Sequence, residues 1–150
     1  IANIQINYFL SYLITLFWLV GIPNAINWMD GLDGLAAGIT AISSFTFLII
    51  NLLSNLTFLA LISSCIFGCS LGFLIHNFYP AKLIMGDGGS NFLGSALAYL
   101  GILPLSNSYE NIPEINNLFH FYDPLLILAI PIWGVYYLNT YQNHFQFYLV

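Results

Sequence analysis

The sequence is almost without charge, and basic side chains are nearly absent. Among its 150 residues there is one basic side chain, Lys82, against six acidic ones, and no arginine. Charged residues make up 5% of the chain and hydrophobic residues 59%. Because a soluble domain is typically about 25% charged, this composition excludes a water-soluble globule. It also argues against a nucleic-acid-binding protein, since such proteins need many Lys and Arg side chains to displace counterions.

Cysteine is scarce as well. Cys65 and Cys69 lie inside one apolar run, four residues apart. Helical spacing puts them on one face, but two thiols alone make a poor metal site. We interpret them as small packing residues without a redox role.

The chain has no signal-peptide pattern, in which a basic stretch precedes a short apolar one. It begins at Ile1, and it ends at Val150 without a polar tail. We therefore expect residues 1–150 to be part of a single integral-membrane domain, with N- and C-terminal portions in a longer protein.

What the sequence does contain is long apolar runs. A bilayer-crossing helix needs roughly 20 such residues. The second, third and fifth runs are long enough; the first, expected to stop at Pro23, and the fourth suffice only if flanking residues continue the helix. The sequence thus predicts an all-α fold, a polytopic transmembrane bundle of about five helices. The five runs cover approximately residues 8–22, 35–53, 57–75, 91–103 and 124–141.

The connection "NLLSNLT" between the second and third runs is short and polar, which predicts a helical hairpin. A hairpin crosses the membrane twice, so residues 23–34 and 76–90 should face the same side. Residues 104–123 should then face the opposite side. The positive-inside rule places Lys82, and with it the first of these faces, in the cytoplasm.

The segment "NAINWMDGLDGLAAGIT", residues 24–40, holds two aspartates between apolar runs. A carboxylate at the bilayer centre costs about 2.5–3.5 kcal/mol, so these groups should lie at an interface or in a polar site. On a helix, Asn27, Asp30 and Asp33 would form one polar strip. For Asp33, capping of the following helix is the structural alternative.

The segment "HNFYPAKLIMGDGGSNFLG" surrounds Asp87 with glycines, which suggests backbone that bends sharply or approaches a ligand. Ser90 and Asn91 can start the next helix, with Asp87 as its cap in the alternative interpretation. Converging carboxylates bind hard cations such as Mg²⁺, often together with substrate phosphates. Lys82 would supply a positive charge for a phosphate, or else extend to the lipid headgroups.

"NAINWMDGLDGLAAG" and "NFYPAKLIMGDGGSNFLG" resemble two signature segments of the polyprenyl-phosphate N-acetylhexosamine-1-phosphate transferases. This is glycosyl transferase family 4, to which phospho-N-acetylmuramoyl-pentapeptide transferase is related. The order of the segments and the two helices between them also match. The family initiates cell-envelope polysaccharides, including the O-antigen of lipopolysaccharide, enterobacterial common antigen and the teichoic-acid linkage unit.

The resemblance implies a phosphoglycosyl transferase in the bacterial inner membrane, with its site on the cytoplasmic face. Such enzymes transfer a sugar-1-phosphate, here expected to be N-acetylhexosamine-1-phosphate, from a UDP-sugar to polyprenyl (undecaprenyl) phosphate and release UMP. The implied cofactor is Mg²⁺, with Mn²⁺ as the alternative, and the implied partners are the two substrates, membrane lipid and a second copy in a homodimer.

The resemblance also assigns roles to individual residues. Asp87 matches the Mg²⁺ ligand, and it is expected to be catalytic together with Asp30 and Asp33. Asn27 and the two aspartates that follow it match residues that line the nucleotide and pyrophosphate pocket. Asn77 matches a substrate-binding asparagine of the same pocket.

The chain also departs from the family. An upstream aspartate pair is missing, Gly134 stands where an aspartate is expected, and His144 is isolated with no arginine nearby; His76 and His120 are interpreted as bystanders. A frameshift or a truncation would explain the altered end, and we expect the fragment alone to be inactive. Two alternatives are a catalytically inactive remnant and a transporter with an acidic ion site, although clustering of the acids on one side disfavours a midplane transport site.

Overall fold

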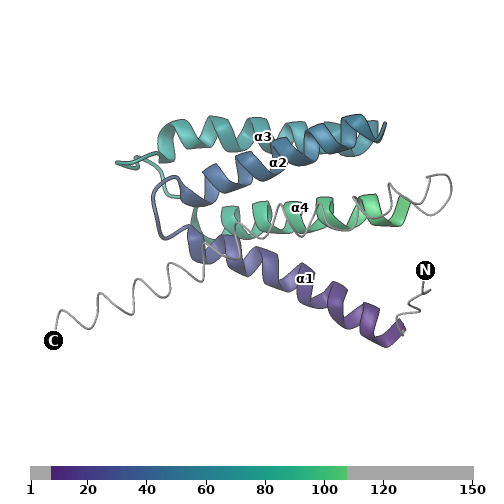
Figure 1. Ribbon diagram of the computed structural model, residues 1–150. Helices are drawn as coiled ribbons and strands as arrows, with labels where there is room; N and C mark the ends of the chain where they lie inside the picture. The colour runs from purple at the N-terminus through teal and green to yellow at the C-terminus, as the bar shows by residue number, and fades with distance from the viewer. Residues whose placement is uncertain (1–7, 108–150) are drawn as a thin grey trace.

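The computed structural model describes residues 8–107, which form four helices and, within that range, no strand (Figure 1). The all-α prediction is confirmed. The helices are α1 (Tyr8–Met29), α2 (Leu35–Leu53), α3 (Thr57–Asn77) and α4 (Gly86–Asn107). The predicted run at 124–141, together with His120, Gly134 and His144, lies outside the described residues.

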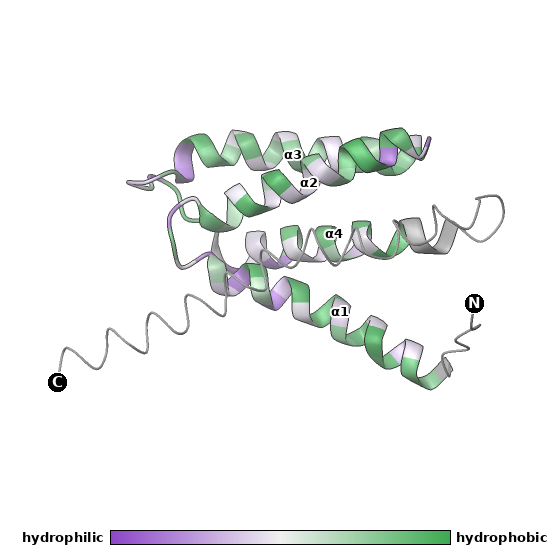
Figure 2. Cartoon of the chain, viewed as in Figure 1, coloured by the Kyte–Doolittle hydropathy of each residue, from purple (hydrophilic) through white to green (hydrophobic). Residues whose placement is uncertain are grey.

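Three of these helices are long and apolar enough to cross a membrane: α1 from Phe9 to Met29, α2 and α3. Their shafts are largely hydrophobic (Figure 2), and large side chains such as Phe17 and Phe58 are exposed on them. In water such surfaces would be costly, whereas lipid accepts them. The chain is therefore a polytopic membrane protein, as the composition predicts.

The expectation that the first helix stops at Pro23 is wrong, because α1 continues through the proline to Met29. Proline removes one backbone donor, but in transmembrane helices polar side chains nearby bond to the backbone and make a proline tolerable. The continuation places Asn27 on the last turn of a helix.

The start of α4 also differs from the prediction. The helix begins at Gly86, before the apolar run and before Ser90. Gly86 has a φ of +69°, a conformation that glycine adopts at little cost. The acidic side chain of Asp87 falls in the first turn, where the positive end of the helix dipole favours it.

The helical hairpin predicted from "NLLSNLT" is present. A short turn joins α2 to α3, with Asn55 at a φ of 59° and the Leu56 amide donating to the Asn51 carbonyl at 2.9 Å. Small side chains let the two helices approach closely. The buried polar residues of the hairpin shafts are Thr40, Ser43, Ser44, Asn51, Ser63 and Ser70.

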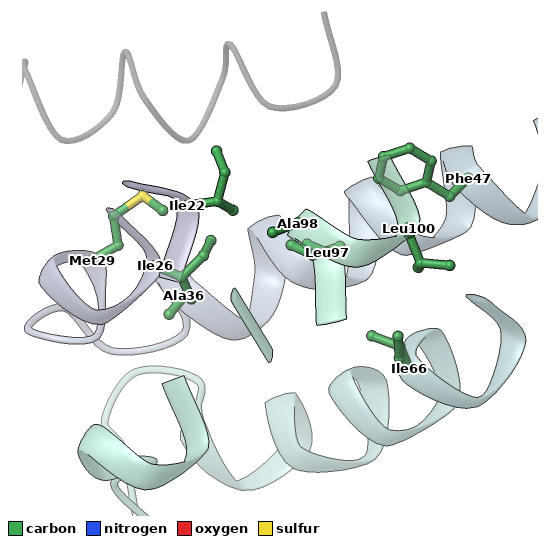
Figure 3. Close-up of a cluster of buried hydrophobic side chains, with 9 residues drawn as sticks. All are labelled: Ile22, Ile26, Met29, Ala36, Phe47, Ile66, Leu97, Ala98 and Leu100. Atoms are coloured by element: carbon green, nitrogen blue, oxygen red, sulfur yellow. The ribbon is translucent and has the colours of Figure 1, made fainter. Parts of the chain in front are cut away.

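The second pair of helices, α1 and α4, packs against α2 through an apolar core. Figure 3 shows this core, to which all four helices contribute. The indole Nε1 of Trp18 on α1 donates to the Ala98 carbonyl on α4 at 3.1 Å, tying the pair together. The core residues are Ile22, Ile26, Met29, Ala36, Phe47, Ile66, Leu97, Ala98 and Leu100.

Candidate active site

The two acidic segments lie at the same end of the bundle, as the hairpin argument predicts. The turn after α1, residues 30–34, and the connection before α4, residues 78–85, are neighbours (Figure 1), and hydrophilic residues gather at this end (Figure 2). Side chains bond across the two segments in both directions. Residues about 50 positions apart in the chain are thereby brought into one polar site.

Asn27 is the direct link between α1 and the first turn of α4. Its Nδ2 donates to Asp87 Oδ1 at 3.1 Å and to Ser90 Oγ at 2.8 Å. The amide group has two protons, so one side chain can make both bonds. Asn27 thus holds the carboxylate that the sequence singles out as a metal ligand.

Asp30 lies just after α1 and reaches the start of α4. Its Oδ2 accepts a hydrogen bond from the Gly86 amide at 3.0 Å. Burial raises the pKa of Asp30 above its ordinary value; the Gly86 amide opposes this rise, and the negative charge of Asp87 adds to it. The two carboxylates are therefore close enough to repel each other, and a cation between them would relieve that repulsion.

Asp33 does not cap α2. The N-cap position is Gly34, where no side-chain cap bond is formed; instead, Asp33 Oδ2 accepts from the Ala81 amide at 3.0 Å. The polar helical strip of Asn27, Asp30 and Asp33 is also wrong, because α1 ends at Met29 and both aspartates belong to the turn. The turn nevertheless directs both carboxylates to the α3–α4 connection.

Asn77, the last residue of α3, is nearly fully buried, at 5% exposed. Its Oδ1 accepts from the Gly34 amide at 3.0 Å, and its Nδ2 donates to the Leu83 carbonyl at 2.8 Å. Gly34 has a φ of +75°. Asn77 thus fixes the start of α2 and the α3–α4 connection at once.

Lys82 lies in the same connection, with its side chain exposed. Its backbone amide donates to the His76 carbonyl at 2.9 Å, and the Leu83 amide donates to the same oxygen at 3.3 Å. This backbone anchoring positions the lysine at the end of the bundle that carries Asp87. His76 contributes its backbone carbonyl to the connection.

Ser90 is a site residue that sequence reasoning treated only as a helix start. It is fully buried, accepts from Asn27 and donates to the Gly86 carbonyl at 3.1 Å. The sequence signal for this role is a serine four residues after the glycine that starts the helix, because a serine side chain can donate to the carbonyl of the preceding turn. Recognising it required knowing that α4 starts at Gly86.

The donor set for a cation is small. Within residues 8–107, no group of three or more His, Cys, Asp or Glu side chains is arranged to hold a metal ion. Asp87 is exposed and Asp30 is its acidic neighbour. The site therefore offers two carboxylates, the N-terminal end of a helix and backbone amides that can meet an anion.

These features define a polytopic helical membrane protein with an acidic site at one end. A comparison with protein families matches residues 1–104 to the model described as "Glycosyl transferase family 4". The chain belongs to this family, as the two signature segments indicate.

Curated relatives agree with this assignment. The chain is 41% identical over 124 residues to the "Probable undecaprenyl-phosphate N-acetylglucosaminyl 1-phosphate transferase" of Bacillus subtilis (strain 168), covering 83% of this chain and 33% of that protein. It is 45% identical over 103 residues to the "Phospho-N-acetylmuramoyl-pentapeptide-transferase" of Latilactobacillus sakei subsp. sakei (strain 23K), covering 69% of this chain and 32% of that protein. The chain thus spans about a third of the length of these relatives.

Proposed function

We propose that the protein containing this chain transfers a sugar-1-phosphate, N-acetylhexosamine-1-phosphate in the first instance, from a UDP-sugar to polyprenyl phosphate and releases UMP. The names of the relatives support this reaction class. The observation that carries the proposal is the joining of the two signature segments: Asn27 to Asp87, and Asp30 to the Gly86 amide. Carboxylates and a helix N-terminus are thereby brought together, a combination that supports binding of a pyrophosphate with a cation.

A divalent cation, Mg²⁺ or alternatively Mn²⁺, fits this donor set. Mg²⁺ is usually bound through one or two carboxylates together with waters and substrate phosphates, and it does not need an all-protein cage. Asp87 would hold it, with Asp30 beside it. When bound, the ion would neutralise charge on the phosphates.

The remaining groups would act by binding and orientation. Asn27 holds one oxygen of the Asp87 carboxylate and leaves the other free to face a ligand. The first turn of α4 presents backbone amides and the positive end of its dipole to a phosphate. Lys82 adds a positive point charge. Together these groups would lower the repulsion between an incoming phosphate oxygen and the pyrophosphate.

The proposed orientation puts this end of the bundle at the cytoplasmic face of a bacterial inner membrane. Lys82 lies at this end, in agreement with the positive-inside rule. The described carboxylates lie in loops or in the first turn of α4, not near the middle of a span, so the geometry gives no support to a transporter. The homodimer, and the inactivity of the fragment by itself, stay predictions that residues 8–107 do not address.

The test uses the full-length protein in membranes, with radiolabelled UDP-N-acetylglucosamine, undecaprenyl phosphate and Mg²⁺. The expected product is a labelled polyprenyl-pyrophosphoryl sugar, formed together with UMP and abolished by chelation. Asp87→Asn should reduce the rate about 100-fold or more. The control is Thr15→Ala, which removes an exposed side-chain bond in the N-terminal half of α1. Equal rates for Asp87→Asn and the control would overturn the metal assignment, and no product from wild type would overturn the reaction.

A further inference from the structure

Gly94 of α4 lies directly against the backbone of α1 at Ile22 and Pro23. A Cβ added at Gly94 would lie 2.5 Å from Pro23 Cα, 3.1 Å from Pro23 N and 3.3 Å from the Ile22 carbonyl oxygen. All three are backbone atoms, so no change of side-chain rotamer can make room. Any side chain at position 94 must move one helix away from the other.

This contact sets Gly94 apart from the other described glycines. Gly21, Gly38 and Gly72 have nothing within 4 Å of an added Cβ, and at Gly89 the neighbour is the flexible side chain of Met85. Among the described glycines up to residue 94, Gly94 alone would put a Cβ within 3.0 Å of another helix's backbone. Its lack of a side chain therefore determines how closely α1 and α4 can pack.

The contact lies next to the hydrogen bonds of the site. Asn27 follows Pro23 by about one helical turn, and Ser90 precedes Gly94 by about one turn. At that level the short amide side chain of Asn27 reaches Ser90 Oγ at 2.8 Å and Asp87 Oδ1 at 3.1 Å. These bonds require the helices to stay at the separation that Gly94 permits.

On the other side of the contact the helices move apart. Figure 1 shows α1 diverging from α4 towards the N-terminal end of α1. There the long side chain of Trp18 spans the wider gap, with its Nε1 3.1 Å from the Ala98 carbonyl oxygen. The two backbones are thus in contact at Gly94 and Pro23, one turn from the site, and the helices diverge beyond that contact.

We propose that Gly94 is a positioning residue for the reaction proposed above: by allowing backbone contact with Pro23, it sets the α1–α4 separation at which Asn27 and Asp30 reach the first turn of α4. The expected loss of activity rests on the proposed function, whereas the effect of Gly94 on the α1–α4 separation does not. Carbon atoms in contact lie about 3.5–4.0 Å apart, so an alanine at this position must displace α1 by about 1 Å. A misplacement of that size can cost about 100-fold in rate.

The experiment compares Gly94→Ala with Gly21→Ala in the full-length protein. Gly21 lies on α1 in open space, so its variant controls for the added methyl group. We expect kcat to fall about 100-fold in Gly94→Ala, with a smaller change in KM, and to stay within about twofold of wild type in Gly21→Ala. Similar kcat values in the two variants would overturn the inference.

A second arm tests the reach of Asn27. Asn27→Gln adds one methylene, which is too long for the normal separation and better suited to the widened one. We expect Asn27→Gln alone to lower kcat, and the double variant with Gly94→Ala to recover about tenfold over Gly94→Ala. Additive losses would contradict the positioning role. If Gly94→Ala does not accumulate, Asn27→Gln by itself tests the inference. Activity of Asn27→Gln within about twofold of wild type would show that the α1–α4 separation at the site is not fixed.

A third arm does not depend on activity. Spin labels attached to cysteines introduced in place of Phe17 and Tyr99, both exposed, report the α1–α4 distance. In this protein Cys65, Cys69 and any other cysteine of the full-length protein are first replaced by serine. We expect Gly94→Ala to lengthen this distance and Gly21→Ala to leave it unchanged. An unchanged distance in Gly94→Ala overturns the inference even in an active enzyme. If the wild-type protein shows no transferase activity but Gly94→Ala still lengthens this distance, the proposed function is overturned and the structural role of Gly94 stays supported.

Discussion

Asn27 on α1 donates to the carboxylate of Asp87 on α4 at 3.1 Å, across 60 residues of sequence. The bond exists because α1 continues through Pro23 and α4 starts at Gly86. The end of α1 contains Pro23 and the start of α4 is rich in glycine, yet both are helical. The site is therefore built on rigid elements, and its chemistry depends on how those elements meet.

Replacement of Asn27 by aspartate should be severely harmful. The change removes both donated hydrogen bonds and adds a third negative charge beside Asp30 and Asp87. We expect sugar-1-phosphate transfer to fall about 100-fold, measured as UMP release by the full-length protein. Asn55→Asp, in the exposed α2–α3 turn at the other end of the bundle, should stay within about twofold of wild type. Equal activities of the two variants would show that the donor at position 27 has no role.

Loss of the Asn77 amide should destabilise the protein. Asn77→Ala leaves the Gly34 amide and the Leu83 carbonyl without their partner, and we expect the free energy of unfolding to fall by about 1–3 kcal/mol. Denaturant unfolding of the full-length protein in micelles would measure it. Asn24→Ala, which removes an exposed bond, should change the value by about 0.5 kcal/mol or less. A loss in Asn77→Ala no larger than this would contradict the linking role.

Gly34 and Gly38 should respond in opposite directions to alanine. Gly34 has a φ of +75°, with Leu74 and Phe78 side-chain atoms 3.4 Å from an added Cβ, so Gly34→Ala should destabilise by about 1–2 kcal/mol. Gly38 is helical with open space around it, so Gly38→Ala should stabilise by about 0.5–1 kcal/mol. Thermal unfolding of both variants measures the contrast. A stabilising Gly34→Ala would mean that this backbone conformation is not required.

Two substitutions at Asp33 separate its hydrogen bond from its charge. Asp33→Asn keeps an oxygen that can accept from the Ala81 amide, whereas Asp33→Ala does not. We expect hydrogen exchange of the Ala81 amide to rise about tenfold in Asp33→Ala, since a bond of about 1.4 kcal/mol is lost, and to stay near wild type in Asp33→Asn. Transfer activity should fall in both variants. Full activity in Asp33→Asn would show that the carboxylate acts only by holding the connection.

The pKa of Asp30 should fall when the charge of Asp87 is removed. Burial raises the pKa of Asp30, and repulsion by Asp87 adds to the rise, so Asp87→Asn should move the titration of Asp30 to lower pH. A raised pKa in the folded state means that stability is lost as the pH increases through it, and this loss should be smaller in Asp87→Asn. Infrared titration of the metal-free protein with labelled aspartate measures the shift. Asp33→Asn should leave the titration unchanged, and an upward shift in Asp87→Asn would contradict the arrangement.

Much of the fold followed from apolar runs and turn chemistry. The bounds of α2 coincide with its run, and the polar turn around Asn55 predicted the hairpin. That hairpin in turn predicted that Asp30 and Asp87 would lie at one end. Periodicity was of no help here, because membrane helices are apolar on most sides; run length was the useful signal.

The sequence could not show where polar residues continue a helix. Proline signals a helix end in water, so the extension of α1 past Pro23 was missed, and with it the helical placement of Asn27. The glycines around Asp87 indicate a loop because glycine destabilises the interior of a helix, yet α4 begins at Gly86. The partners of Asp30 and Asp33 are backbone amides of a distant segment. Because every residue except proline has a backbone N–H, the residue type does not reveal which amide will be the donor.

The α2–α3 hairpin has a consequence for biosynthesis. Asp30 and Asp87 meet only because the chain between them crosses the membrane an even number of times. If either α2 or α3 failed to insert, the two carboxylates would lie on opposite sides of the membrane. The site would then not form, although the sequence would still contain all of its residues. Each polar residue within these helices, such as the buried Asn51, makes the free energy of membrane insertion less favourable. The apolar composition of two helices outside the site is thus a condition for assembling the site during membrane insertion.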